Sequence, residues 1–183
     1  MQVQLPKRVR QMDDNEYRIV SAVFADTLPY RWRILVTDAA GMDGRPFTIP
    51  TSLIPTILGM ATGAFLPSAA IGYLGSAVNA GYLINVGAAY DALGVTHQRL
   101  LVHETTHVWQ GKNSTFALSY VYNSVLNQGM HGSGAYAFVA GQPWKSYNVE
   151  QQATIVDTWF NSGMPTSGKL YPYIRDHVRK GDA

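Results

Sequence analysis

The hydrophobic and polar positions of the chain form strand-like runs in its first half and helical spacings in its second half. The largely apolar runs RWRILVTD (residues 31–38) and GYLINVG (residues 81–87) predict strands, and glycines bound the second run. The run EYRIVSAVFAD (residues 16–26) fits either a helix or a strand. Because strand signals come first and helical signals second, the pattern predicts an α+β fold.

Three segments of the second half have apolar residues at helical spacing. The first helix is expected to begin at Thr96, as N-cap, and to run to about Gln110, with Gly111 as its end. The residues expected on its apolar stripe are Leu101, Thr105, Val108 and Trp109. A second helix is predicted over residues 116–128, and a third over residues 148–163.

The third helix has recognisable signals at both ends. Asn148 is expected to cap it, Gln151 stands at the capping-box position, and Gly163 is expected to end it. The residues expected on its buried face are Val149, Ala153, Val156 and Phe160. Between the second and third helices, the glycine-rich segment 129–147 is expected to be a loop.

The segment from Pro46 to Tyr90 contains no formally charged residue, which raises the question of a membrane span. A spanning helix needs about twenty mostly apolar residues. Pro50, Pro55 and Pro67 interrupt the segment, and its remainder is rich in glycine and asparagine. A buried, glycine-rich core segment is therefore favoured, with membrane insertion as the alternative.

Composition narrows the classes of protein to which the chain can belong. Of its 183 residues, 46% are hydrophobic and 14% are charged, which fits one globular domain over residues 1–183, with residues 1–15 as a flexible N-terminus. The net charge of +2 argues against a nucleic-acid-binding protein, which needs a dense basic face. Because cysteine is absent, any metal must be held by His, Asp, Glu or backbone oxygen.

The segment LLVHETTHVWQGKN (residues 100–113) carries two histidines four residues apart, with a glutamate directly after the first. On a helix, His103 and His107 point the same way, so their ring nitrogens can converge on one zinc ion. Glu104 is rotated by about 100° from His103, which places it beside the ion, where a general base is needed. The alternative is an ordinary helix with two histidines that face solvent.

Two histidines leave a catalytic zinc ion one protein ligand short. The gluzincin pattern takes a glutamate from a later helix, followed by a small residue that lets the two helices approach, and Glu150 with Ala153 fits it. Asp157 lies two turns beyond Glu150 and can accept a hydrogen bond from a ligand histidine. His131, His177 and Asp157 are the alternative third ligands, and Glu150 is otherwise explained as a carboxylate favoured by the helix dipole.

The segments LVHETTHVWQ and YNVEQQATIV resemble the gluzincin-type zinc metallopeptidases of bacteria, in particular the small DUF4157-like, Vgr-related domains associated with secretion systems and polymorphic toxins. The likeness covers about residues 100–160. It implies a zincin-like fold, with a small mixed sheet packed on the helices, in which His103, His107 and Glu150 bind zinc. Glu104 is then the catalytic acid/base. A strand before the zinc helix, for which GYLINVG is the candidate, would form the sheet edge to which an extended peptide adds.

These residues lead us to expect zinc-dependent hydrolysis of a peptide bond, with Glu104 taking a proton from metal-activated water and delivering it to the leaving nitrogen. A hydrogen-bond donor should stabilise the oxyanion. The loop offers His131, Tyr136 and Tyr147 for this role, and Tyr136 is preferred. The alternatives to an enzyme are a catalytically silent metal-binding scaffold and a toxin-associated, membrane-active module.

The expected partners are a protein or peptide substrate, which includes a peptidoglycan stem peptide, and an immunity or inhibitor protein. No nucleic acid is expected, and membrane association is disfavoured. The first twenty residues lack the apolar run of a secretory signal. We therefore expect the protein either to be cytoplasmic or to be exported by a specialised secretion system.

Overall fold

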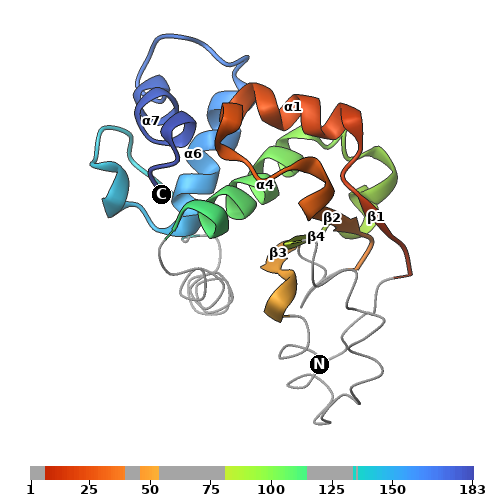
Figure 1. Ribbon diagram of the computed structural model, residues 1–183. Helices are drawn as coiled ribbons and strands as arrows, with labels where there is room; N and C mark the ends of the chain where they lie inside the picture. The colour runs from red at the N-terminus through yellow and green to blue at the C-terminus, as the bar shows by residue number, and fades with distance from the viewer. Residues whose placement is uncertain (1–6, 40–45, 54–80, 115–133, 135) are drawn as a thin grey trace.

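The protein's computed structural model describes residues 7–39, 46–53, 81–114, 134 and 136–183 (Figure 1). Its fold is α+β, as predicted. The strands are β1 Val9–Gln11, β2 Ile34–Thr37, β3 Phe47–Pro50 and β4 Tyr82–Asn85. The α-helices are α1 Asp14–Phe24, α4 Gln98–Asn113, α6 Val149–Asn161 and α7 Tyr171–Asp176. The predicted helix over residues 116–128 lies outside the described residues, as does segment 54–80 of the uncharged stretch.

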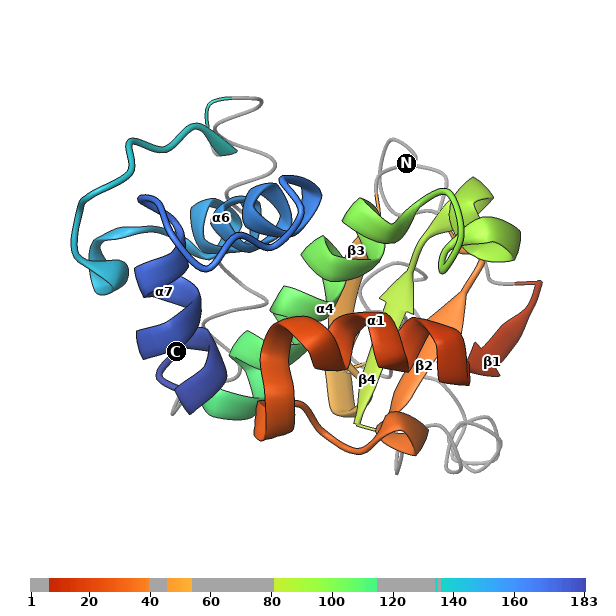
Figure 2. The same ribbon diagram turned by 90° about the horizontal axis from the view of Figure 1, so that it is seen from above.

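The described strands form one mixed sheet in the order β1–β2–β4–β3. β1 pairs antiparallel with β2, β2 pairs parallel with β4, and β3 pairs antiparallel with β4. The prediction that residues 81–87 form the sheet edge is therefore wrong, because β4 is hydrogen-bonded on both sides. The end strand next to α4 is β3, as Figure 2 shows.

Residues 9–15, which were expected to belong to a flexible N-terminus, contain a strand and the start of a helix. Residues 9–11 pair with β2, and α1 begins at Asp14. Asp13 and Glu16 form a capping box that fixes the start of this helix. Glu16 is 1% exposed and forms an ion pair with Arg10 of β1 at 2.7 Å, so the first strand and the first helix are joined by a partly buried contact.

The described α-helices gather on one side of the sheet, and the core lies between them and the strands (Figure 1). α4 packs against α1, α6 and β3, which makes it the central helix of the fold. The predicted stripe on α4 is buried: Leu101, Thr105, Val108 and Trp109. No helix in the described part of the chain has the length and apolar character needed to cross a membrane.

The ends of α4 differ from the prediction. Thr96 does not cap it, because the helix begins at Gln98 and His97 at the N-cap position makes no capping hydrogen bond. Gly111 does not end it either, since the helix continues to Asn113. A Cβ atom at Gly111 would lie 2.7 Å from Cε1 of Tyr82. This glycine therefore allows α4 to approach β4 closely, rather than stopping the helix.

The start of α6 agrees with the prediction, and its buried face does so in part. The side chain of Asn148 accepts a hydrogen bond from the backbone N–H of Gln151 at 2.8 Å, and Gln151 Oε1 accepts one from the backbone N–H of Asn148 at 3.0 Å. The helix ends at Asn161, just before Gly163, which has a φ of +87°. The predicted Ala153 and Val156 are buried, whereas Val149 and Phe160 are only partly buried. The face is shifted because Glu150 and Asp157 also turn toward the interior.

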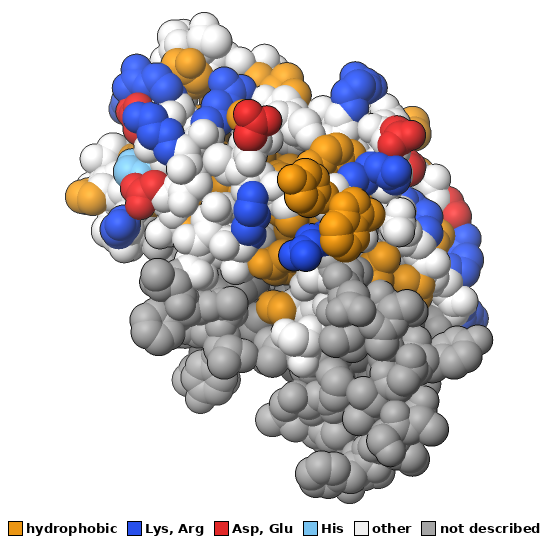
Figure 3. Space-filling view, in the orientation of Figure 1, with side chains coloured by type: hydrophobic (Ala, Val, Ile, Leu, Met, Phe, Trp, Pro, Cys, Tyr) orange, Lys and Arg blue, Asp and Glu red, His pale blue; other side chains and the backbone are white. Residues whose placement is uncertain are grey.

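The face shown in Figure 3 has no dense basic patch over the described residues: Lys and Arg side chains are interspersed with acidic, hydrophobic and uncharged ones. The exposed large side chains of the described residues include Tyr30 and Trp32, whose rings stack with centroids 6.4 Å apart. The guanidinium group of Arg33 lies 4.9 Å from the centre of the Trp32 ring.

Candidate metal centre

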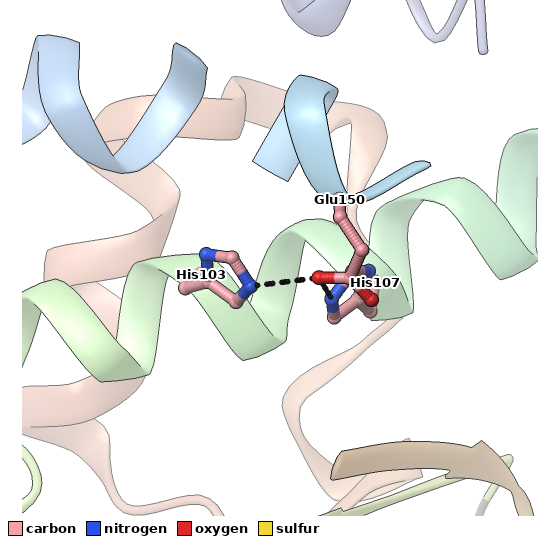
Figure 4. Close-up of side chains that lie close together, drawn as sticks. All are labelled: His103, His107 and Glu150. Carbon is pink, nitrogen blue, oxygen red and sulfur yellow. Dashed lines mark hydrogen bonds and ion pairs between the residues drawn. The ribbon is translucent and has the colours of Figure 1, made fainter. Parts of the chain in front are cut away.

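The side chains of His103, His107 and Glu150 meet between α4 and α6 (Figure 4). One potential ligand atom from each residue lies within 4.8 Å of the other two. Glu150 Oε2 is 3.4 Å from His103 Nε2 and 3.5 Å from His107 Nε2. His103 and His107 lie on one face of α4. The structure brings to them the carboxylate of Glu150, the preferred third ligand, although Glu150 is 47 residues from His103 in the sequence.

This cluster is buried on one side and reaches solvent on the other. The Glu150 side chain is fully buried and that of His107 is 3% exposed, whereas that of His103 is 14% exposed. Solvent therefore approaches the cluster at His103. A catalytic zinc site has to keep a coordination position that water can reach, whereas a structural site is closed.

The electrostatics of the cluster favour a cation. Burial would lower the pKa of His103, but hydrogen bonds to Asp157 and Glu150 and the charge of Glu104 raise that pKa to about 10. Burial would raise the pKa of Glu150, but the neighbouring His107 and His103 hold it well below its usual range. The metal-free cluster thus keeps a carboxylate and a proton together at neutral pH, and a divalent cation can replace that proton.

The outer partners of the histidines direct their other ring nitrogens toward Glu150. His103 Nδ1 lies 2.8 Å from Asp157 Oδ2, as the sequence predicted, and His107 Nδ1 lies 2.9 Å from Gln110 Oε1. Asp157 is itself held by Arg99, whose Nε donates to Oδ1 at 3.0 Å. With each Nδ1 facing an acceptor, the two Nε2 atoms and one carboxylate oxygen form the nitrogen and oxygen donor set that suits zinc.

Glu104 lies outside this donor set, and it is close enough to His103 for its charge to help raise the pKa of that ring. It is 4% exposed and is not part of the metal-binding group found among the described residues. Thr48 Oγ1, on β3, donates to Glu104 Oε2 at 2.8 Å. Sequence reasoning missed Thr48, because nothing in the short run FTIP indicates that this hydroxyl reaches a carboxylate on α4.

The oxyanion candidates have different surroundings. The Tyr136 ring lies next to His103, with the two ring centroids 6.1 Å apart. The Tyr147 hydroxyl is engaged elsewhere: it donates to Val139 O at 2.7 Å, and its ring packs edge-on against Tyr173. His131 lies outside the described residues. Tyr136 is thus the candidate that the described structure brings to the cluster.

Two of the alternative third ligands, Asp157 and His177, do not join the cluster as ligands, and His131 lies outside the described residues. Asp157 contacts the outer ring nitrogen of His103, so it supports a histidine instead of facing the common centre. His177 forms a 2.8 Å contact with Asp182 and stacks on Trp144, with ring centroids 5.5 Å apart. Neither residue belongs to the group that His103, His107 and Glu150 form.

Ala153 provides a test of the close approach of the two helices. It is fully buried on α6, between Glu150 and Asp157 on the face turned toward α4. Ala153→Leu should lower the free energy of unfolding by about 1–3 kcal/mol through overpacking, and should also weaken zinc binding. Thermal unfolding and zinc competition titration check both effects.

The matched control for that substitution is Ala89→Leu, which overpacks another buried alanine, in the short helix Gly87–Ala92 that packs on β2. It should reduce stability and leave zinc affinity close to that of the wild type. If both variants weakened zinc binding equally, helix separation would not be the cause.

Comparison of the chain with protein-family models, curated proteins and solved structures found no match. The likeness to gluzincin-type metallopeptidases therefore rests on the motif residues alone. A proposal about function has to rest on the cluster of His103, His107 and Glu150.

Proposed function

We propose that the protein is a zinc-dependent metallopeptidase with a zincin-like fold, which hydrolyses a peptide bond. The observation that carries this proposal is the meeting of His103, His107 and Glu150 within 4.8 Å, with Glu104 buried beside them. A metal-binding scaffold needs the first three residues only. A buried carboxylate that is held next to the cluster but not within it is what a hydrolase requires.

The roles of the residues follow from their places. His103, His107 and Glu150 would hold the metal, and a bound zinc ion would supply a Lewis acid that activates water and a carbonyl group. Glu104, oriented by Thr48, takes a proton from the attacking water and passes it to the leaving nitrogen. Tyr136, beside His103, is our candidate donor to the oxyanion.

Strand β3 is our candidate for the edge that binds an extended substrate. It is the end strand beside α4 among the described strands, and Thr48 connects it directly to Glu104. A peptide that added to β3 by backbone hydrogen bonds would run alongside the general base. This arrangement favours a protein or peptide substrate. A peptidoglycan stem peptide, which is shorter than a protein segment, is the alternative substrate.

The proposal is tested by proteolysis with and without metal. The zinc-loaded chain should cleave an unfolded protein such as casein, chelator treatment should abolish cleavage, and added zinc should restore it. A chain that binds zinc but cleaves neither casein nor isolated stem peptides would support the scaffold interpretation instead.

Zinc uptake should depend on pH, because His103 has to lose a proton. Its pKa rises from 6.5 to about 10 in the metal-free fold, so the protonated ring stabilises this fold fully below about pH 6.5, and that contribution is lost as the pH rises through 10. Zinc competes with this proton. Between pH 7 and 9, apparent zinc affinity should therefore rise by about tenfold per pH unit.

Titration calorimetry in buffers of different ionisation enthalpy measures this exchange directly. About one proton should be released per zinc ion bound at neutral pH. Asp157→Asn removes a hydrogen-bonding carboxylate that raises the pKa of His103, so it should release fewer protons. Binding without proton release in the wild type would contradict the expected ion pair.

A further inference from the structure

A chain of buried amides connects the loop before α6 with His107. Gln152 Nε2 donates to Trp144 O at 3.3 Å, and Gln152 Oε1 lies 2.8 Å from Gln110 Nε2. Gln110 Nε2 also donates to Val149 O at 3.0 Å. The other end of the same amide, Gln110 Oε1, lies 2.9 Å from His107 Nδ1. Gln110, Gln152 and His107 are all buried, so water does not compete for these bonds.

Two backbone carbonyl groups fix the direction of this chain. A carbonyl oxygen only accepts hydrogen bonds, so the amide nitrogen of Gln110 has to face Val149, and that of Gln152 has to face Trp144. The amide oxygen of Gln110 is then the atom that faces His107, and His107 Nδ1 has to donate to it. In a neutral imidazole only one nitrogen carries hydrogen, which leaves the lone pair on Nε2.

We infer that Gln110 is a positioning residue that holds His107 in the Nδ1–H tautomer, so that Nε2 carries the lone pair that would bind the metal beside Glu150. His107 Nε2 is the atom that lies 3.5 Å from Glu150 Oε2. The inference rests on the proposed metal centre, and it does not depend on peptidase activity.

The two histidines are supported by different chemistry. The partner of His103 Nδ1 is the carboxylate of Asp157, which carries a charge and stabilises a protonated ring. The partner of His107 Nδ1 is a neutral amide, whose orientation is fixed by the carbonyl of Val149, with Gln152 as a second acceptor of the same amide nitrogen. The ring of His107 is therefore oriented without a further negative charge, and its geometry depends on how α4 docks on the start of α6.

The test compares zinc affinity in Gln110→Met and Gln152→Met. Gln110→Met keeps the length and burial of the side chain but removes the acceptor for His107, so zinc affinity should fall about 10–100-fold. Gln152→Met breaks the same amide chain one step further away, and Val149 still orients Gln110. This control should lose similar stability in thermal unfolding but keep zinc affinity close to that of the wild type.

Nitrogen-15 spectra of the zinc-loaded wild type supply a readout that packing alone does not move. They should show His107 bound through Nε2, with a slowly exchanging Nδ1–H signal that is weakened or lost in Gln110→Met. Ligation through Nδ1, or equal zinc affinity in Gln110→Met and the wild type, would overturn the inference. Equal losses of affinity in both variants would do so too, because they would indicate a packing effect.

The same experiment separates this inference from the proposed function. If the wild type binds zinc and the variants behave as described, but casein is not cleaved, the positioning role stands and the peptidase activity does not. If the wild type takes up no zinc, the metal centre itself is wrong, and the role of Gln110 falls with it.

Discussion

Replacing Glu104 by glutamine is expected to lower kcat for peptide hydrolysis by about 10²–10⁴-fold while the chain keeps its zinc. The amide cannot take the proton of the attacking water, and the three proposed ligands are unchanged. Thr48 can still donate to the amide oxygen at position 104, so the side chain should keep its place. Casein hydrolysis and metal analysis of the same samples measure both properties.

Asp91→Asn is the matched control for this change. It also replaces a carboxylate by an amide, but at an exposed ion pair with Arg8 on the surface. Activity and zinc content should both stay near wild-type values. If Glu104→Gln retained full activity, another group would have to act as the base, and the role proposed for Glu104 would be wrong.

Replacing Glu150 by alanine is expected to remove zinc and activity together. Glu150 contributes the oxygen that faces both histidine Nε2 atoms, so its loss leaves two protein ligands from the described cluster. The loss of zinc affinity should exceed the roughly 10–100-fold cost of changing an outer partner such as Asp157. Competition titration of Glu150→Ala, Glu150→Gln and Asp157→Asn ranks these variants by zinc affinity.

The order of affinities distinguishes a ligand from a supporting residue. Wild type should bind most tightly, Asp157→Asn less tightly, and both Glu150 variants least tightly. Circular dichroism of the metal-free variants shows whether the fold survives, because removing one partner of a buried ion pair costs about 3–5 kcal/mol. A folded Glu150→Ala that binds one zinc ion with wild-type affinity would move the third ligand to another residue, with His131 as the first candidate.

The parts of the site that depend on local geometry could be predicted from the sequence. One helical turn separates His103 from His107, so their shared direction follows from the spacing alone. The place of Glu104 beside them follows from the same helix, and the capping box of α6 is a local signal as well. Glu150 is a long-range partner, and the gluzincin-like pattern, rather than any spacing rule, pointed to it.

The residues that hold these side chains in place could not be predicted in the same way. Thr48 reaches Glu104 from an element distant in sequence, and Gln110, although only three residues after His107 on α4, takes its orientation from Val149 at the start of α6. Neither segment carries a sequence signal for these long-range contacts. The strand order could not be predicted either, because β4 has a second neighbour only through its pairing with residues 47–50, which the sequence does not indicate. The role of Gly111 could not be predicted from its residue type, because glycine is favoured both at helix ends and where two elements pack closely.

The most direct test of the metal centre is zinc X-ray absorption spectroscopy on the loaded chain, with the metal-to-protein ratio measured on the same sample. We predict one zinc ion per chain, bound by two imidazoles and by oxygen ligands that include one exchangeable water. A zinc ion with fewer than two imidazoles, or one enclosed by four protein ligands with no exchangeable water, would contradict the account.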